Sequence, residues 1–99
     1  MMTISIYNLA GDFAENKDIA RDVRIKQLMP PLKRKEGVIL DFDRVDLSTQ
    51  SFIHALISDP IRQYGTDVLD LIDFKNCNER VKTLISIVVD YMQEGLNPD

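Results

Sequence analysis

The chain lacks the features of a disulfide-bonded, membrane-spanning or secreted protein. Its 99 residues include one cysteine, Cys77, and no tryptophan. A single cysteine excludes an internal disulfide and is compatible with the cytoplasm, where we expect the protein. No apolar run approaches the ~20 residues of a membrane span. The N-terminus has no positively charged start followed by an apolar stretch, so we expect no signal peptide.

The chain also lacks an excess of positive charge. Its formal net charge is −4, which argues against binding to nucleic acid or to an anionic membrane surface. Lys33-Arg34-Lys35, with Arg21, Arg24 and Lys26, forms one basic region. No aromatic residues alternate with these charges, so we interpret the region as a solvated helix face. The glycine-rich nucleotide-binding motifs GxxxxGK(S/T) and GxGxxG are both absent, and we expect no cofactor.

What is present suits one small globular domain. Hydrophobic residues make up 44% of the chain and charged residues 28%, and a chain of this length forms a single domain. We expect that domain to span residues 1–94. Gly95 can end a helix, so residues 95–99 are predicted to form a flexible tail.

The first half of the chain predicts a strand, a helix and a second strand. Thr3–Tyr7 alternates and is rich in β-branched and aromatic residues, which predicts a strand. A helix is expected to start at Asn16 or Asp18 and to break or kink at Pro30-Pro31, because proline lacks the N–H group. The apolar run that begins Val38–Phe42 is typical of a central strand covered on both faces. The sequence leaves open whether a further short strand forms near Leu9 to Phe13.

The second half predicts a helix, a strand and a helix. The helix opening on Ser51-Phe52 should end or bend at Pro60, and Gly65 should close this unit. Val68–Ile72 is the third predicted strand. Asn76 or Asn78 can cap the last helix, which has apolar residues at i, i+3 and i+4.

The predicted order βαβαβα implies an α/β fold with a small, largely parallel sheet covered by amphipathic helices, because parallel strands need crossover connections. The expected core residues are Ile4, Ile6, Val38, Leu40, Phe42, Leu56, Leu69, Leu71, Val81, Ile85 and Val88.

The segment Val38–Leu56 also carries a family resemblance. An apolar strand ends in Leu40-Asp41-Phe42, Val45 follows, Ser51-Phe52 opens a helix, and Asn76 follows the next apolar segment. Over residues 16–92 this pattern resembles the STAS-like proteins of unknown function, small relatives of the STAS domains of anti-sigma-factor antagonists and sulphate transporters. The resemblance implies a single STAS-like domain that regulates a protein partner without catalysis. It further implies that the partner is an ATPase of the histidine-kinase-like superfamily or another signalling or defence protein.

In STAS antagonists a phosphorylatable serine opens the helix within Asp-Ser-x-Gly. When the chain is aligned on Asp41 and Val45, Thr49 stands at the aspartate, Gln50 at the serine and Phe52 at the glycine, with Ser51 one residue past the serine position. The motif is therefore not intact, and Ser48, Thr49 and Ser51 are the candidate switches. The predicted partner surface is the turn from Asp43 to Gln50 with the first half of the next helix. The residues assigned to this site are Ser51, Thr49, Ser48, Gln50, Phe52, Asp41 and Asp43.

Two interpretations of Ser51 compete. A serine at a helix start accepts a hydrogen bond from a free backbone N–H, and this capping role is common. A phosphate there would instead meet the positive end of the helix and add charge beside Asp41, Asp43 and Asp46, repelling an acidic partner surface.

An enzymatic alternative also begins at Asp41. The spacing Asp41-x-Asp43 after an apolar strand matches the nucleophile and acid/base of haloacid-dehalogenase-type phosphatases, which use Mg²⁺. The companion motifs are missing, so strand-end carboxylates in solvent are the simpler interpretation. A second possibility is a cluster of carboxylates that binds a hard cation, formed by Asp41, Asp43, Asp46, Asp70 and Asp73. We interpret these side chains instead as solvated loop carboxylates and expect no metal.

The remaining candidates are single residues and one helix face. His54 follows Ser51 by three residues without an orienting partner, and Cys77 has no second cysteine nearby. We interpret both as structural. Ile87, Val89 and Tyr91 lie off the main apolar stripe of the last helix, which favours a homo-oligomer as a further alternative.

Overall fold

The computed structural model describes residues 2–96, with side chains described as far as Gln93. In chain order the elements are β1 (Met2–Ser5), α1 (Ile6–Ala10), β2 (Phe13–Ala14), α2 (Lys17–Val23), the π-helix η1 (Arg24–Leu28), α3 (Met29–Lys33), β3 (Val38–Asp41), β4 (Leu47–Ser48), α4 (Gln50–Tyr64), the 3₁₀-helix η2 (Thr66–Leu71), β5 (Ile72–Lys75) and α5 (Glu79–Leu96).

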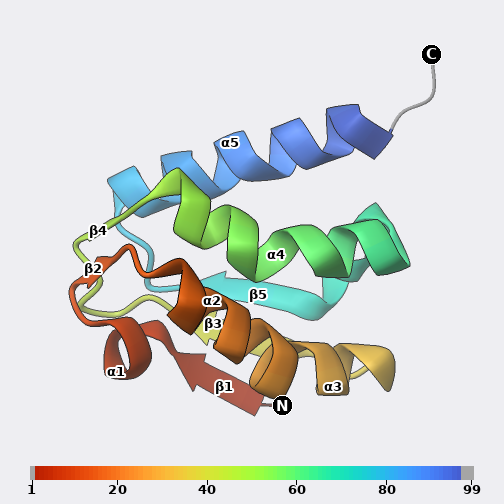
Figure 1. The fold of residues 1–99 in the computed structure, drawn as a ribbon, viewed down its shortest axis with the longest axis horizontal. Helices are drawn as coiled ribbons and strands as arrows, with labels where there is room; N and C mark the ends of the chain where they lie inside the picture. The colour runs from red at the N-terminus through yellow and green to blue at the C-terminus, as the bar shows by residue number, and fades with distance from the viewer. Residues whose placement is uncertain (1, 97–99) are drawn as a thin grey trace.

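A three-stranded parallel sheet in the order β1-β3-β5 forms the centre of the fold. Helical segments connect β1 to β3 and β3 to β5, as the predicted βαβαβα order requires. In Figure 1 α2 and α4 lie in front of the sheet, and α5 lies along α4. The fold is therefore the small, mainly parallel α/β domain that the sequence predicts.

The sheet buries one of its two faces. Leu40 of β3 is aligned with Ile4 on one side and Phe74 on the other, and Leu40 and Ile4 are fully buried. The neighbouring row alternates to the opposite face, where Ile39 is half-buried between exposed Thr3 and exposed Asp73. The expectation that β3 is covered on both faces is therefore wrong.

The hydrophobic core fills the space between the buried sheet face and the helices. All expected core residues are buried except Leu69 and Leu71, which are half-buried and pack against the core. The apolar stripe of α4, predicted from its spacing, is buried completely. Its members are Phe52, Ile53, Leu56 and Ile57.

The first strand is shorter than predicted because Ser5 starts a helix. The Ser5 hydroxyl accepts a hydrogen bond from the backbone N–H of Asn8 at 3.2 Å and caps α1. Ile6 and Tyr7, expected in the strand, are therefore helical. Their β-branched and aromatic side chains favour strands, but Ile6 reaches the core from this short helix.

The two consecutive prolines do not break the helical segment. Asn16 caps α2 as predicted, accepting bonds from the N–H groups of Asp18 and Ile19. The segment widens into a π-helix before Pro30, and the N–H of Met29 donates to the carbonyl of Arg24, five residues back. Proline cannot donate and its ring crowds the carbonyl four residues earlier. The wider turn accommodates both prolines at the start of α3.

Helix α4 passes through Pro60 and ends at Tyr64, so of the two outcomes expected at Pro60, an end or a bend, the end does not occur. Pro60 is buried with the helix face around it. Gly65 closes the helix as predicted, with φ 81° and its N–H donating to the carbonyl of Ile61 at 2.8 Å. A positive φ of this kind favours glycine.

The third strand lies later than predicted. Thr66–Leu71 forms a 3₁₀-helix, and β5 runs from Ile72 to Lys75, so only Ile72 belongs to both the predicted and the observed strand. A short apolar run such as Val68–Ile72 fits a strand or a buried helical turn equally well. The alignment of Ile72 with Val38 decides the register.

The last helix begins as predicted and extends further. The Asn78 side chain accepts a bond from the N–H of Val81 at 2.9 Å, which makes Asn78 the cap. Helix α5 continues through Gly95 to Leu96, and residues 97–99 of the expected tail lie outside the described residues. Among the residues that are described, no helix is long and apolar enough to cross a membrane.

Candidate functional site

The carboxyl ends of the parallel strands meet at one edge of the sheet, where α/β folds commonly place their sites. β3 ends at Asp41, and the turn after β5 begins at Asn76. One carboxylate oxygen of Asp41, Oδ1, accepts hydrogen bonds from Asn76 Nδ2 and from the backbone N–H of Asp43, both at 2.9 Å. Asn76 has φ 58°, a left-handed conformation that asparagine tolerates better than most residues. Asp41 therefore ties two strand ends together.

A tight turn follows β3. The N–H of Val45 donates to the carbonyl of Phe42 at 3.0 Å, and Arg44 at the third position of the turn has φ 69°. The Arg44 guanidinium lies over the ring of Tyr7, 5.5 Å from its centre. This cation–π contact anchors the turn to α1.

The turn continues into a small ladder between β2 and β4. The carbonyl of Asp12 accepts bonds from the N–H groups of Asp46 and Leu47 at 2.8 and 3.1 Å. The Ser48 hydroxyl donates to the carbonyl of Ala14 at 2.9 Å. Asn78 Nδ2 donates to the carbonyl of Asp46 at 2.8 Å. The loop is thus fixed both to the segment before α2 and to the start of α5.

The start of α4 separates the candidate hydroxyls. Thr49 is the cap: its Oγ1 accepts a bond from the N–H of Phe52 at 3.1 Å. Ser51 is the second residue of the helix and is exposed, so the capping role proposed for Ser51 is wrong. Gln50 is also exposed, whereas Phe52 is fully buried and presents no side-chain surface to a partner.

The hydrogen bonds to Asp41 stabilise its charged form, which suits a role in ordering the turn. The hydrogen bond from Asn76 lowers the pKa of Asp41 below its ordinary value, and the bond from the Asp43 N–H and the nearby Lys75 act in the same direction. Hydrogen bonds to the charged form stabilise it. Asp41 thus orders the turn through Oδ1. Among the described side chains, those of residues 2–93, no group of three His, Cys, Asp or Glu could hold a metal ion.

A family model described as a STAS-like domain of unknown function matches residues 20–82. The chain belongs to the STAS-like domain family. The match includes β3, the Asp41 turn, α4 and β5, as the resemblance indicated. Comparison with curated proteins and with solved structures finds no match.

The other residues considered from the sequence occupy separate places in this STAS-like domain. His54 packs edge-on against Tyr91, with ring centres 6.3 Å apart, so it contacts α5. Cys77 is half-buried, and burial raises the pKa of its thiol, which suits a passive cysteine. Arg24 donates to the carbonyl of Ala55 at 3.0 Å and lies 3.2 Å from the Asp59 carboxylate. Arg24 therefore joins α2–η1 to α4, while its basic neighbours Arg21 and Lys26 are exposed.

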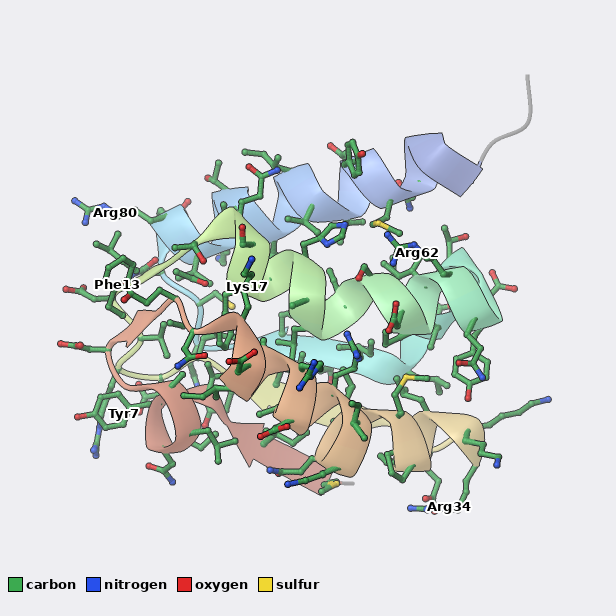
Figure 2. The ribbon with its side chains drawn as sticks, in the orientation of Figure 1. Tyr7, Phe13, Lys17, Arg34, Arg62 and Arg80 are labelled. Carbon is green, nitrogen blue, oxygen red and sulfur yellow. The ribbon has the colours of Figure 1, made fainter. Side chains whose placement is uncertain are left out.

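Sequence reasoning missed the residues that hold this edge together across long separations. Phe13 is paired with Leu47, Tyr7 lies under Arg44, and Asn78 clamps the loop at Asp46. Figure 2 shows Phe13 at the outer end of the molecule, between Arg80 above and Tyr7 below. The asparagine could be recognised as a helix cap, but no local pattern marks the tyrosine or the phenylalanine.

Proposed function

We propose that this STAS-like domain is a non-enzymatic protein–protein interaction module switched by phosphorylation of Ser51. The partner-binding surface consists of the turn and ladder from Asp43 to Gln50 with the first turns of α4. By the resemblance to anti-sigma-factor antagonists, the partner is an ATPase of the histidine-kinase-like superfamily or another signalling or defence protein.

The observation that carries the proposal is the difference between Ser51 and its neighbours. Ser51 is exposed on the first turn of α4, while the Thr49 hydroxyl caps the helix and the Ser48 hydroxyl is bonded to Ala14. A kinase can reach Ser51 without disrupting either bond. A phosphate there is stabilised by the positive end of the helix, and it adds about −1.5 to −2 charge to the binding surface.

The test compares three baits in pull-downs from an extract of the source cells: the intact chain, Ser51→Asp and Ser86→Asp. Ser86 is an exposed serine of α5, so its substitution adds the same charge away from the surface. We expect the amount of one retained protein to change only with Ser51→Asp. Equal retention by all three baits would contradict the switch, and retention of nothing by any bait would contradict the module.

A second candidate function is a homo-oligomeric subunit, which the outer face of α5 favours. Ile87 is 47% exposed and Tyr91 is 63% exposed, one helical turn apart. Light scattering after size exclusion would show a dimer that Ile87→Ser with Tyr91→Ser dissociates. A monomeric intact chain at high concentration would rule this candidate out.

A further inference from the structure

Two exposed apolar side chains form a pair in the ladder that precedes the proposed switch. Phe13 and Leu47 are partners in the register of β2 and β4, and they are 46% and 39% exposed. We propose that the Phe13–Leu47 pair is the apolar anchor by which a protein partner docks, and that the partner surface is an apolar pocket rimmed by Lys and Arg. This inference rests on the proposed function and names the chemistry of its partner.

The outward direction of the pair follows from the ladder itself. Side chains alternate between the faces of a strand, and Ala14, the residue after Phe13, is fully buried. Phe13 therefore lies on the opposite, solvent face, and the parallel register places Leu47 beside it. Neighbouring strands lie about 4.8 Å apart, so the two side chains form one continuous apolar surface.

The anchor is held rigidly before any partner arrives. The Asp12 carbonyl binds the N–H groups of Asp46 and Leu47, and the N–H of Thr49 donates to the Ala14 carbonyl at 3.0 Å. These bonds fix both strands on either side of the pair. A preorganised backbone loses little conformational entropy on binding, and aromatic side chains, Phe among them, are enriched in protein–protein interfaces.

The charges around the pair indicate which charges a partner needs around its apolar pocket. Phe13 is preceded by Asp12 and followed two residues later by Glu15, and Asp43 and Asp46 precede Leu47; all four carboxylates are exposed. Across 11–17 and 42–50 the cations are Lys17, exposed at the start of α2, and Arg44, whose guanidinium lies over the Tyr7 ring. Arg80 lines a hollow that also contains Asp46 and Glu79, so carboxylates accompany it.

The sequence predicts that a phosphate on Ser51 repels an acidic partner. The acidic residues around the pair predict the opposite effect on binding. An acidic partner would already be repelled by Asp43 and Asp46 without any phosphate. A basic rim is attracted by these carboxylates, and a phosphate on Ser51, four residues after Leu47, adds to the attraction. Phosphorylation of Ser51 therefore strengthens docking.

The first experiment uses a defined probe. The intact chain labelled with ¹⁵N is titrated with a short helical peptide of leucine and lysine, and with its leucine–glutamate counterpart. We expect amide shifts concentrated in residues 12–15 and 43–51 with the lysine peptide alone. Phe13→Ser with Leu47→Ser should weaken binding at least about tenfold, since the burial of both side chains is lost.

Matched variants make this result specific. Ile87→Ser with Tyr91→Ser removes two apolar residues of α5 that are more exposed than the Phe13–Leu47 pair, and should leave the affinity unchanged. Asp12→Asn with Asp46→Asn keeps the apolar pair and should weaken binding at low salt, whereas Ser51→Asp should strengthen it about two- to fivefold. Shifts centred on α5, equal binding of the glutamate peptide, or unchanged affinity of the Phe13/Leu47 variant would overturn the proposal. The dispersion of the amide spectrum verifies that each variant is folded.

The same variants separate this inference from the proposed function. If the intact chain retains a cellular partner that the Phe13/Leu47 variant also retains, the module stands and the anchor is wrong. If the intact chain retains no partner but the lysine peptide binds at the pair, the anchor stands and the proposed regulatory function fails.

Discussion

Asn76 Nδ2 donates a hydrogen bond to Asp41 Oδ1 at 2.9 Å, joining residues that are 35 positions apart. The bond connects the end of β3 to the turn after β5, and Asp41 also holds the N–H of Asp43. The turn that leads to the proposed binding surface is therefore ordered by a strand that follows it in the chain.

Replacing Asn76 should separate the hydrogen bond from the backbone conformation. Asn76→Ala loses the bond and leaves alanine, which tolerates φ 58° less well than asparagine, so we expect it to lower the free energy of unfolding by about 1–2 kcal/mol. Asn76→Gly loses the same bond without backbone strain and should be less destabilising. Urea denaturation measures both. Equal losses would mean that the left-handed conformation carries no strain.

The Asp41 carboxylate should make stability depend on pH at the acidic end. Its pKa is lower in the folded chain than the ordinary value of about 3.9, chiefly because Asn76 donates to it. The stabilisation is therefore complete above the unfolded-state pKa and is lost as pH falls through the folded-state value. The stability difference between the intact chain and Asp41→Asn should be constant near neutral pH and shrink below about pH 4. A pH-independent difference would contradict this role.

The two hydroxyls at the start of α4 should respond differently to truncation. Thr49→Ala removes the cap on the N–H of Phe52 and should destabilise the domain by about 1 kcal/mol. Ser51→Ala removes an exposed hydroxyl and should change stability by less than about 0.5 kcal/mol. Thermal unfolding of both variants provides the comparison. A larger loss of stability for Ser51→Ala than for Thr49→Ala would show that Thr49 is not the residue that caps α4.

Asn78 should show two separable roles. Asn78→Asp keeps an acceptor for the N–H of Val81 but removes the donor to the carbonyl of Asp46. We expect the start of α5 to remain protected from amide exchange in this variant, while the amides of Asp46 and Leu47 exchange faster. Asn78→Ala should lose protection at both places. Unchanged exchange at Asp46 in Asn78→Asp would show that the Asp12 carbonyl alone holds the loop.

Local patterns were sufficient for the central strand and the two long helices. Val38 and Leu40 are apolar and buried, and the spacing of Phe52, Ile53 and Leu56 identifies the buried stripe of α4. Local patterns failed where one residue fits two structures. Tyr7 favours strands but follows the capping Ser5, and Leu69 and Leu71 occupy a 3₁₀-helix from which they reach the core only in part.

The sequence by itself determined the α/β class, the position of β3 and the helix that begins after Thr49, because apolar periodicity and capping groups act over a few neighbouring residues. Only the tertiary structure decided that Asp41 binds Asn76 and that Phe13 lies beside Leu47. Both pairs join residues 34 or more positions apart in different segments. Asp41 meets Asn76 because parallel strands bring their carboxyl ends to one edge, and Phe13 meets Leu47 because β2 and β4 pair in parallel; no short stretch of sequence encodes either pairing.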